Sequence, residues 1–394
     1  MFHPSLSRRR ALAALAALPW LSSMARAEVA GARVVVVGGG FAGATAARHL
    51  KQAAPELEVL LLEPKTSFHT CPFSNYVIAG LRGIGEIEHS YRRLVRDCRV
   101  NHLRVEVQAI DAPARRLRLV DGRELSYDRL LLAPGIDMRW NAVEGYDRAA
   151  AEHAPHAWQA GAQTSLLRRQ LQAMDDGGLV LISVPDNPYR CPPGPYERTS
   201  LIADYLAKHK PRSKLLILDG KDGFSKQALF QAGWKQLYGE RIEWVGRAAD
   251  GRVMRIDAAR REVRTEFGSL HRAAVINLIP PQRAGAVAEH SGLTDASGWV
   301  PVDPRSFQAR GDPFVYVVGD AAIAAPMPKS AYCANAQAKV AVAALLADLA
   351  GQPTPEATGR TPATARWRRA TRCPSARATR SPTGISPRCR AARR

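Results

Sequence analysis

The feature that most constrains this 394-residue chain is a glycine cluster between an apolar run and an expected helix. Gly38, Gly40 and Gly43 follow the β-branched run 34–37, which is typical of a strand buried on both faces of a parallel sheet. The first glycine permits a tight turn, the second lets backbone N–H groups approach a pyrophosphate, and the third lets the helix pack on the strand. Glu63 closes the next apolar run 20 residues after Gly43, where a carboxylate suits ribose hydroxyls. These residues predict an α/β unit that binds an adenine dinucleotide, FAD or NAD.

The two ends of the chain differ in composition from its middle. Ser7 precedes three arginines, a short apolar run and the small-residue site Ala25-Arg26-Ala27. This order predicts a twin-arginine signal peptide over residues 1–27 and export to the periplasm. Residues 356–394 are rich in Arg, Ala, Thr, Pro and Ser, which predicts a disordered basic tail.

These two ends carry most of the formal net charge of +20. The signal holds four arginines and residues 360–394 hold eleven, so the remainder of the chain has a net charge of only +5. The charge therefore gives no support to a nucleic-acid partner. No segment after the signal is long and apolar enough to predict a transmembrane segment.

The tail also has a second interpretation, which comes from the genetic code. When the reading frame of residues 361–367 is moved back by one base, the codons can encode Asn-Thr-Cys-Tyr-Ser-Ser-Val. We therefore hypothesise a frameshift near residue 360 that replaces the authentic C-terminal segment.

A second α/β unit is expected from residue 178 onward. Strand 179–184, helix 195–209 and strand 214–219 repeat the Rossmann-like order. The first loop reads Pro185-Asp186-Asn187-Pro188, and proline has no N–H group to offer a pyrophosphate. The sequence therefore predicts a second Rossmann-like domain without an NAD loop, and NAD(P)H is not the expected electron donor.

We expect the chain to return to the first domain at residue 275. A strand over 314–318 then leads into Gly319 and Asp320 at the start of a helix. The Asp320 carboxylate can accept a hydrogen bond from a ribityl hydroxyl of FAD, or it can serve as an ordinary helix N-cap. The predicted domain order is a signal peptide (1–27), a first FAD-binding part (28–148), a second Rossmann-like domain (149–274), a second FAD-binding part (275–355) and the tail (356–394).

Three motifs resemble the flavoprotein subunit of flavocytochrome c sulfide dehydrogenase, in the pyridine nucleotide-disulfide oxidoreductase superfamily. They are Thr70-Cys71 with Ser74-Asn75, Cys191-Pro192-Pro193-Gly194-Pro195-Tyr196-Glu197-Arg198, and Met327-Pro328-Lys329-Ser330 with Ala334-Asn335. The resemblance implies an α/β fold with two Rossmann-like dinucleotide-binding domains of the glutathione-reductase type. The C-terminal interface domain of that fold is expected to be truncated or frameshifted here.

The resemblance also implies roles for the cysteines. Cys71 is expected to hold FAD covalently through a thioether to its 8α-methyl group, and Cys191 to be half of a redox-active disulfide above the ring. The second cysteine of the family lies in an Asn-Thr-Cys-Tyr-Ser segment, which the shifted frame restores near position 363. Cys333 is the in-frame substitute, although disulfide formation requires that its Cα lie within about 7 Å of that of Cys191.

The implied reaction is oxidation of sulfide to sulfur or polysulfide. Sulfide attacks a disulfide sulfur and leaves a persulfide and a thiolate. Because no Cys-x-x-Cys-His sequence occurs, the c-type cytochrome that takes the electrons is expected to be a separate subunit.

Two charged residues are candidates for assisting this reaction. Glu197 is a candidate proton acceptor or a solvated acid in the first helical turn. Lys329 either steadies charge on the reduced flavin or is a plain surface lysine. No metal-ligand spacing occurs.

Two other functions remain open from the sequence. A sulfide:quinone oxidoreductase shares this scaffold, but it would require a membrane-docking amphipathic C-terminus, and the tail has no apolar face. The other alternative is a flavin-binding protein that is inactive because its C-terminal segment is lost.

Overall fold

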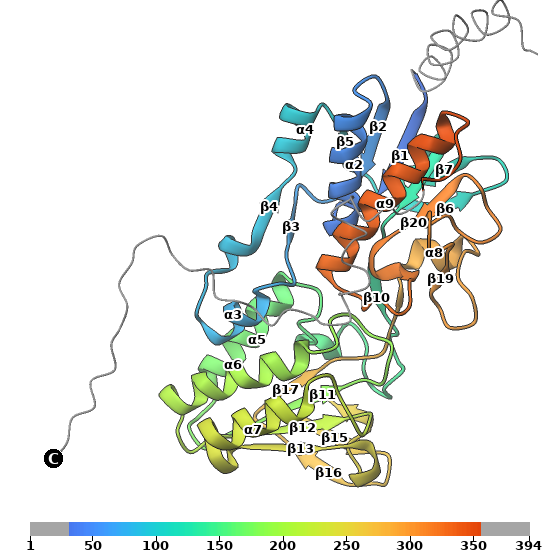
Figure 1. Ribbon diagram of the computed structural model, residues 1–394. Helices are drawn as coiled ribbons and strands as arrows, with labels where there is room; N and C mark the ends of the chain where they lie inside the picture. Colours follow the sequence, from blue (N-terminus) through green and yellow to red (C-terminus); the bar gives the residue numbers. More distant parts are fainter. Residues whose placement is uncertain (1–30, 356–394) are drawn as a thin grey trace, which may run out of the picture. The chain divides into compact units, whose positions relative to one another are not determined.

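The computed structural model describes residues 31–355 (Figure 1). The predictions for residues 1–27 and 356–394 therefore lie outside the described residues. Between residues 31 and 355, no helix has the length and apolar character needed to cross a membrane.

The first sheet is parallel and forms the centre of the first α/β unit. Its strands, in spatial order, are β20 (Val315–Val317), β9 (Arg129–Leu132), β1 (Arg33–Val37), β2 (Glu58–Leu62) and β5 (Asn101–Leu103). Val34, Val35 and Val36 of β1 are fully buried because β1 has a strand on each side and helices pack nearby. The strand predicted from the glycine cluster is therefore confirmed, with Glu63 one residue beyond β2.

Two helices rich in small residues pack together beside this sheet, as Figure 1 shows. They are α2 (Phe41–Ala53) and α9 (Ala331–Leu349). The buried face of α2 consists of alanines, Gly43 and Leu50, so the α9 helix can approach closely. α9 begins directly after Ser330, whose Oγ accepts a hydrogen bond from the Cys333 N–H at 3.2 Å.

The second sheet is also parallel, in the order β13 (Ile242–Val245), β12 (Lys214–Asp219), β11 (Leu179–Val184) and β17 (Val275–Leu278). Helices α5 (Ala162–Ala173), α6 (Gly194–His209) and α7 (Gln227–Tyr238) pack against its strands. The two predicted strands, β11 and β12, have the predicted bounds, and the helix between them begins one residue early. The α/β fold with two Rossmann-like units is confirmed.

One strand lies in a different sheet from the one we expected. β17 pairs in parallel with β11, so it completes the second sheet and does not return to the first. The next strand, β18 (Gln282–Ala284), pairs antiparallel with β10 (Ile136–Met138). The prediction was wrong here because an apolar run predicts a buried strand without indicating which sheet it joins.

Shorter elements lie outside the two parallel sheets. One antiparallel meander consists of β6 (Val107–Asp111), β7 (Arg116–Leu119) and β8 (Glu124–Ser126), between β5 and β9 in the chain. A second consists of β14 (Val253–Asp257), β15 (Glu262–Thr265) and β16 (Leu270–Arg272). The remaining pairs are β3 (Ser67–His69) with β4 (Glu88–Ser90) and β19 (Val300–Pro301) with β21 (Ala322–Ile323). The remaining α-helices are α3 (Ser74–Ala79), α4 (Arg92–Cys98) and α8 (Ala286–His290).

The segment after β20 also differs from the expectation. Gly319–Ala321 form a single 3-10 turn, and the α-helix that we expected to start there begins only at Ala331. Pro326 and Pro328 lie between the turn and α9, and proline cannot supply the N–H that a continuous helix requires. No α-helix N-terminus therefore lies at Asp320.

Candidate active site

The glycine loop after β1 has the geometry of a dinucleotide cradle. Gly38 has φ +93°, and a Cβ there would overlap the Ala133 carbonyl oxygen. A Cβ at Gly43 would overlap the Gly38 carbonyl oxygen, so this glycine lets α2 pack against the turn. A Cβ at Gly40 would meet no atom within 4 Å, so there is open space beside the loop.

Hydrogen-bond donors and an acidic group face this space. Gly40 is the N-cap of α2 and no side chain caps the helix, so its first N–H groups are available to a phosphate. Glu63 Oε2 accepts a hydrogen bond from the Gly39 N–H at 2.9 Å, and Oε1 accepts one from the Lys65 N–H at 3.0 Å. Because a carboxylate has about four acceptor sites, Glu63 retains capacity for ribose hydroxyls.

The Gly319–Ala321 turn and the start of β18 each hold one buried polar atom that has no partner within residues 31–355. Asp320 Oδ2 pairs with Arg190 Nε at 2.6 Å, while Asp320 Oδ1 is buried and has no partner among the described residues. Gln282 Oε1 accepts from the Arg190 N–H at 2.9 Å, and its Nε2 is likewise unpartnered. Since β18 contacts this turn, an orphaned acceptor and an orphaned donor flank Arg190. Buried polar atoms without partners indicate a binding site for a polar ligand.

Cys71 lies in the loop before α3, against the same arginine. Arg190 Nη1 donates to Cys71 Sγ at 3.3 Å, and the sulfur lies 3.7 Å from the Trp158 carbonyl oxygen. The Cys71 carbonyl accepts from Ser74 Oγ at 2.7 Å, which fixes the loop at the start of α3. A cation therefore lies against the half-buried Cys71 sulfur, an environment typical of a reactive cysteine.

Cys191 lies at the start of the loop that leads into α6. Its φ is +55°, in the left-handed region that residues other than glycine rarely adopt. Two hydrogen bonds hold it there: the Cys191 N–H donates to the Lys329 carbonyl at 2.8 Å, and its carbonyl accepts from the Gly194 N–H at 2.7 Å. Strained backbone of this kind clusters at functional sites.

Burial and neighbouring charges keep the Cys191 thiol protonated. Burial, together with the nearby groups Glu197, Cys71 and Asp320, raises the pKa of Cys191 to about 12, although Arg190 acts in the opposite direction. Cys71 is thus close enough to act on the ionisation of Cys191. Cys191 is a free thiol, so the pairing with Cys333 is not formed in this structure.

Glu197 lies in the first turn of α6, with its side chain exposed at the rim of the site. Surrounding protein still removes part of its solvation and raises its pKa from the ordinary value, while Lys226 opposes this shift. A raised pKa makes a carboxylate a better proton acceptor near neutral pH.

Lys329 is tied to the Gly319–Ala321 turn. Its Nζ donates to the carbonyls of Asp320 at 2.7 Å and Ala322 at 3.0 Å, and it lies 3.7 Å from the centroid of the Trp299 ring. Burial lowers the pKa of Lys329 to about 8, although Asp320 acts in the opposite direction. Lys329 is therefore a half-buried residue of the site and not a plain surface lysine.

Sequence reasoning missed the residues that hold the two cysteine loops together. Trp158 is buried, its carbonyl meets Cys71, and its Nε1 donates to the Arg190 carbonyl at 3.1 Å. The Arg198 guanidinium lies 4.8 Å from the centroid of the Trp158 ring. The one available signal was Asn277, a polar residue inside an otherwise apolar strand, which bonds Arg198 Nη1 at 2.8 Å.

The equivalent edge of the second sheet is closed by side chains. Asp219 ends β12 just as Glu63 follows β2, but it is fully buried. Its carboxylate bonds Tyr196 Oη at 2.6 Å, Lys221 Nζ at 2.6 Å and Trp244 Nε1 at 3.0 Å. The ring of Phe224 stacks on Tyr196 at 3.6 Å. A ribose would have to displace this cluster, which supports the expectation of a domain without an NAD site.

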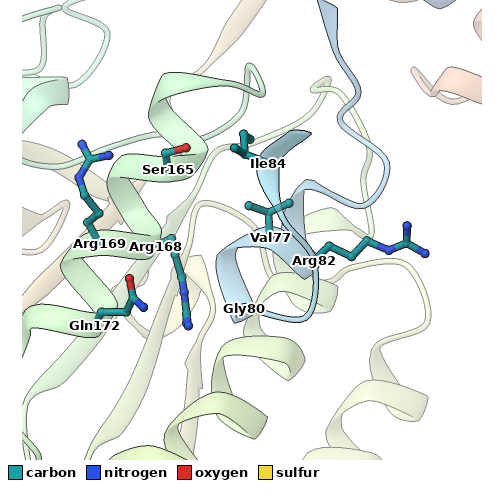
Figure 2. A pocket seen from close by; sticks show the side chains of 8 residues that line it. All are labelled: Val77, Gly80, Arg82, Ile84, Ser165, Arg168, Arg169 and Gln172. Carbon is teal, nitrogen blue, oxygen red and sulfur yellow. The ribbon is translucent and has the colours of Figure 1, made fainter. Parts of the chain in front are cut away.

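A surface pocket of about 270 Å³ lies between the α3 segment and α5 (Figure 2). It is lined by Val77, Gly80, Arg82, Ile84, Ser165, Arg168, Arg169 and Gln172. None of the predicted site residues line it, so we place the candidate active site at the two cysteines and not in this pocket. Among residues 31–355, no group of three or more His, Cys, Asp or Glu residues could hold a metal ion.

The residues around the glycine loop fit an FAD molecule. The uncapped end of α2 and the space at Gly40 suit its pyrophosphate, and Asp320 Oδ1 offers the unfilled acceptor that a ribityl hydroxyl needs.

Comparisons with known proteins agree with this fold. The family model for pyridine nucleotide-disulphide oxidoreductases matches residues 32–174, and the model for the central part of the flavocytochrome c sulfide dehydrogenase flavoprotein chain matches residues 164–280. The structure of the sulfide:quinone oxidoreductase from Aquifex aeolicus has a TM-score of 0.69 at 18% identity, over 82% of this chain and 78% of that one. The protein is thus a flavoprotein oxidoreductase with the pyridine nucleotide-disulfide oxidoreductase fold.

Sequence relatives indicate which family within this fold class the chain belongs to. The flavoprotein chain of sulfide dehydrogenase from Chlorobaculum thiosulfatiphilum is 62% identical over 45 residues, which are 11% of this chain and 94% of that sequence. Mouse mitochondrial sulfide:quinone oxidoreductase is 24% identical over 299 residues, which are 73% of this chain and 65% of the mouse protein. The chain belongs to the family of the flavocytochrome c sulfide dehydrogenase flavoprotein chain, among the sulfide-oxidising flavoproteins.

Proposed function

We propose that this chain is the FAD-dependent flavoprotein subunit of a sulfide dehydrogenase that oxidises sulfide to sulfur or polysulfide and passes electrons to a c-type cytochrome. The observation that carries the proposal is the meeting of Cys71, Cys191 and Asp320 around Arg190. The proposed covalent anchor of the cofactor (Cys71), the sulfur of Cys191 and the proposed acceptor for the ribityl chain (Asp320) therefore lie close together. The export signal expected at residues 1–27 supports a periplasmic location.

In this proposal, separate residues of the site bind FAD and anchor it covalently. Glu63, Asp320 and the Gly38–Gly43 loop hold FAD, and Gln282 Nε2 is free to donate a hydrogen bond to it. Cys71 forms the covalent thioether. When bound, FAD supplies an acceptor of two electrons that can release them singly.

Cys191 carries the sulfur chemistry, paired in the oxidised state with the cysteine that the shifted reading frame restores near position 363. Sulfide attacks one sulfur of this disulfide, a new S–S bond forms, and the bond between the two cysteines breaks. The products are a persulfide on one cysteine and a thiolate on the other. Glu197, whose pKa is raised, receives the proton that sulfide or a thiol releases.

A quinone is the alternative electron acceptor. It is favoured by the likeness of the fold to the Aquifex aeolicus sulfide:quinone oxidoreductase and by the mouse relative of the same name. The alternative differs from our proposal only in the acceptor, because both use the same cysteine and FAD site.

The test compares the two acceptors under identical conditions. Holoprotein is mixed anaerobically with sulfide, and reduction of a c-type cytochrome or of a soluble ubiquinone analogue is followed. We expect the cytochrome to be reduced faster. Faster reduction of the quinone analogue would show that quinone, and not the cytochrome, is the electron acceptor. A yellow protein that sulfide never bleaches would show that the chain binds flavin but is inactive.

A further inference from the structure

Asn75 joins the helix that follows Cys71 to the helix that follows Cys191. Its Nδ2 donates to the Gly194 carbonyl at 3.3 Å, and its Oδ1 accepts from Arg198 Nε at 2.9 Å. Asn75 is the second residue of α3, and Gly194 is the first residue of α6. A single side-chain amide therefore connects the ends of the two cysteine loops.

Both ends of this connection are hydrogen-bonded to the backbone of a cysteine. The Cys71 carbonyl accepts from Ser74 Oγ at 2.7 Å, and Ser74 directly precedes Asn75. The Cys191 carbonyl accepts from the Gly194 N–H at 2.7 Å. A Cβ on Gly194 would lie only 3.2 Å from Cys191 Sγ, so the backbone of Gly194 runs beside that sulfur. A shift of α3 relative to α6 would therefore change the spacing of the two cysteines.

The orientation of the Asn75 amide is set by Arg198. A guanidinium has only donors, so the atom of Asn75 that faces Arg198 Nε must be the oxygen. The amide nitrogen is then left to donate to the Gly194 carbonyl, which can only accept. Arg198 is itself held firmly: it is 1% exposed, and it also donates to Asn277 Oδ1 at 2.8 Å and to the Ala157 carbonyl at 2.7 Å.

The charge of Arg198 does not explain why residue 75 is an asparagine. Within residues 31–355, the hydrogen-bond acceptors of Arg198 are all neutral. An aspartate at position 75 would accept the same bond and would also balance the buried charge. An amide differs from a carboxylate in having a donor, and the donor of Asn75 goes to Gly194. The bond to Gly194 is therefore what asparagine adds at this position.

A second contact between the two loops depends on a sulfur atom. Arg190 Nη1 donates to Cys71 Sγ at 3.3 Å, so this contact changes with the chemical state of Cys71. The bond from Asn75 to Gly194 involves neither sulfur. It is therefore independent of any reaction at the two cysteines.

We propose, on the basis of the function proposed above, that Asn75 is a positioning residue that fixes the spacing between Cys71 and Cys191 by holding Gly194 against α3. It touches neither sulfur, and no covalent bond is made or broken at Asn75. In the proposed reaction Cys71 anchors the flavin and Cys191 carries the sulfur chemistry. Their spacing therefore sets how closely the reacting sulfur approaches the flavin.

The first experiment measures how readily the Cys191 loop opens in the reduced full chain. Alkylation by iodoacetamide is followed at a fixed pH by mass spectrometry of the Cys191 peptide, with the Cys98 peptide as the internal reference. The test variant is Asn75→Asp, which keeps the acceptor for Arg198 and lacks the donor to Gly194. Asn75→Ala, which lacks both, is the second variant, and thermal unfolding checks that each protein is folded.

Asn277→Asp is the matched control. Asn277 also accepts a hydrogen bond from Arg198 through Oδ1, so the substitution places a carboxylate against the same guanidinium. The Nδ2 of Asn277 donates to the carbonyls of Pro155 at 2.7 Å and His156 at 2.9 Å, and not to a cysteine loop. The two aspartate variants therefore differ in which donor they remove.

We expect Asn75→Asp and Asn75→Ala to speed alkylation of Cys191 by at least about fivefold, because the loss of one hydrogen bond shifts a local opening equilibrium by about that factor. Asn277→Asp should leave the rate within about twofold of the wild type. Alkylation of Cys98 should be the same in all four proteins.

The second experiment tests whether the spacing affects the reaction. In holoprotein with the reading frame repaired near residue 360, flavin bleaching is measured against sulfide concentration. We expect Asn75→Asp to lower the limiting rate about tenfold and to leave the half-saturating sulfide concentration within about twofold. The reason is that the variant displaces the reacting sulfur without altering how sulfide binds.

Three outcomes would overturn the proposal: unchanged alkylation of Cys191 in a folded Asn75 variant, an equal increase in Asn277→Asp, or an unchanged limiting rate of bleaching. Alkylation requires no sulfide turnover. A chain that does not oxidise sulfide can therefore still show the expected alkylation, and an active chain can fail to show it, so failure of this proposal is distinct from failure of the proposed function.

Discussion

At the scale of single residues, Cys191 is held in a backbone conformation that residues other than glycine rarely adopt. Its backbone is held in the left-handed region by hydrogen bonds to Lys329 and Gly194. Conformations of this kind cost on the order of 1–3 kcal/mol and persist only where surrounding contacts enforce them. The sulfur itself is buried beside Cys71 and Arg190. The conformation of Cys191 therefore lowers the free energy of unfolding, while the surrounding contacts hold its side chain in one orientation.

Cys71 gives the first prediction at this scale. In the wild type, flavin should remain with the polypeptide after acid denaturation because a thioether survives unfolding. The Cys71→Ser variant should bind FAD through the glycine loop and release all of it under the same conditions. The measurement is flavin absorbance in the protein pellet and supernatant. Equal release from both proteins would show that FAD is not covalently held.

His156 gives a prediction about pH. Burial, followed by the charges of Arg198 and Arg148, lowers its pKa to about 4, and its Nδ1 accepts the Trp158 N–H at 2.9 Å. Below pH 6.5 the unfolded chain therefore binds a proton that the folded chain does not. The free energy of unfolding should fall by about 3 kcal/mol as the pH drops from 6.5 to 4.

The check is thermal unfolding of wild type and His156→Asn across that pH range. Asparagine can keep an acceptor near Trp158 but does not titrate. We expect the acid slope to be smaller in the variant, and parallel curves would contradict the assignment.

At the scale of elements, the unit from β1 to β2 was predictable because each of its steps depends on local chemistry. Buried valines form the strand, the glycines permit the turn, and Glu63 follows the next strand. The equivalent edge of the second sheet, after β11, could be interpreted by the same local chemistry, since prolines remove the donors that a phosphate needs.

Gly40 and Gly43 allow a matched test of this unit. Gly43→Ala places a methyl group on the Gly38 carbonyl, so we expect a loss of about 3 kcal/mol or more in stability. Gly40→Ala meets open space in the protein, so the stability without cofactor should change little while FAD content falls. Chemical denaturation and the flavin-to-protein ratio measure the two effects. A Gly40→Ala protein with full FAD content would contradict the placement of the pyrophosphate.

The second unit predicts that NADH does not reduce the flavin. Asp219 is fully buried and bonded to Tyr196, Lys221 and Trp244, so it cannot bind a ribose without breaking this cluster. The measurement is flavin absorbance after anaerobic addition of excess NADH, with dithionite as the control for reducibility. Rapid bleaching by NADH would overturn this interpretation.

The elements that sequence reasoning placed wrongly depend on distant partners. The apolar run at Val275 fits either sheet, and only its pairing with β11 decides between them. The Gly319-Asp320 pair looks like a helix start, yet the prolines at 326 and 328 delay α9 to Ala331. Local pattern identifies an element, but its neighbours in space are set by packing across the chain.

At the scale of the whole molecule, the two α/β units were accessible from sequence, whereas the contacts that join the two cysteine loops were not. Arg190 bonds Asp320, which is 130 positions away, and Arg198 bonds Asn75, which is 123 positions away. No spacing rule links residues so far apart. Trp158, Arg198 and Gln282 therefore became visible only once the fold had brought them to the site.

The central claim is that sulfide reduces the flavin through Cys191. It is tested most directly by anaerobic mixing of the holoprotein with sulfide while the flavin absorbance is followed. We expect the chain with its reading frame repaired near residue 360, which serves as the wild type in this test, to bleach. Its Cys191→Ser variant, at equal FAD content, should bleach at least about a hundredfold more slowly, as expected when an essential nucleophile is lost. Cys98→Ser is the matched control and should bleach like the wild type. Bleaching of Cys191→Ser at the wild-type rate would contradict the account.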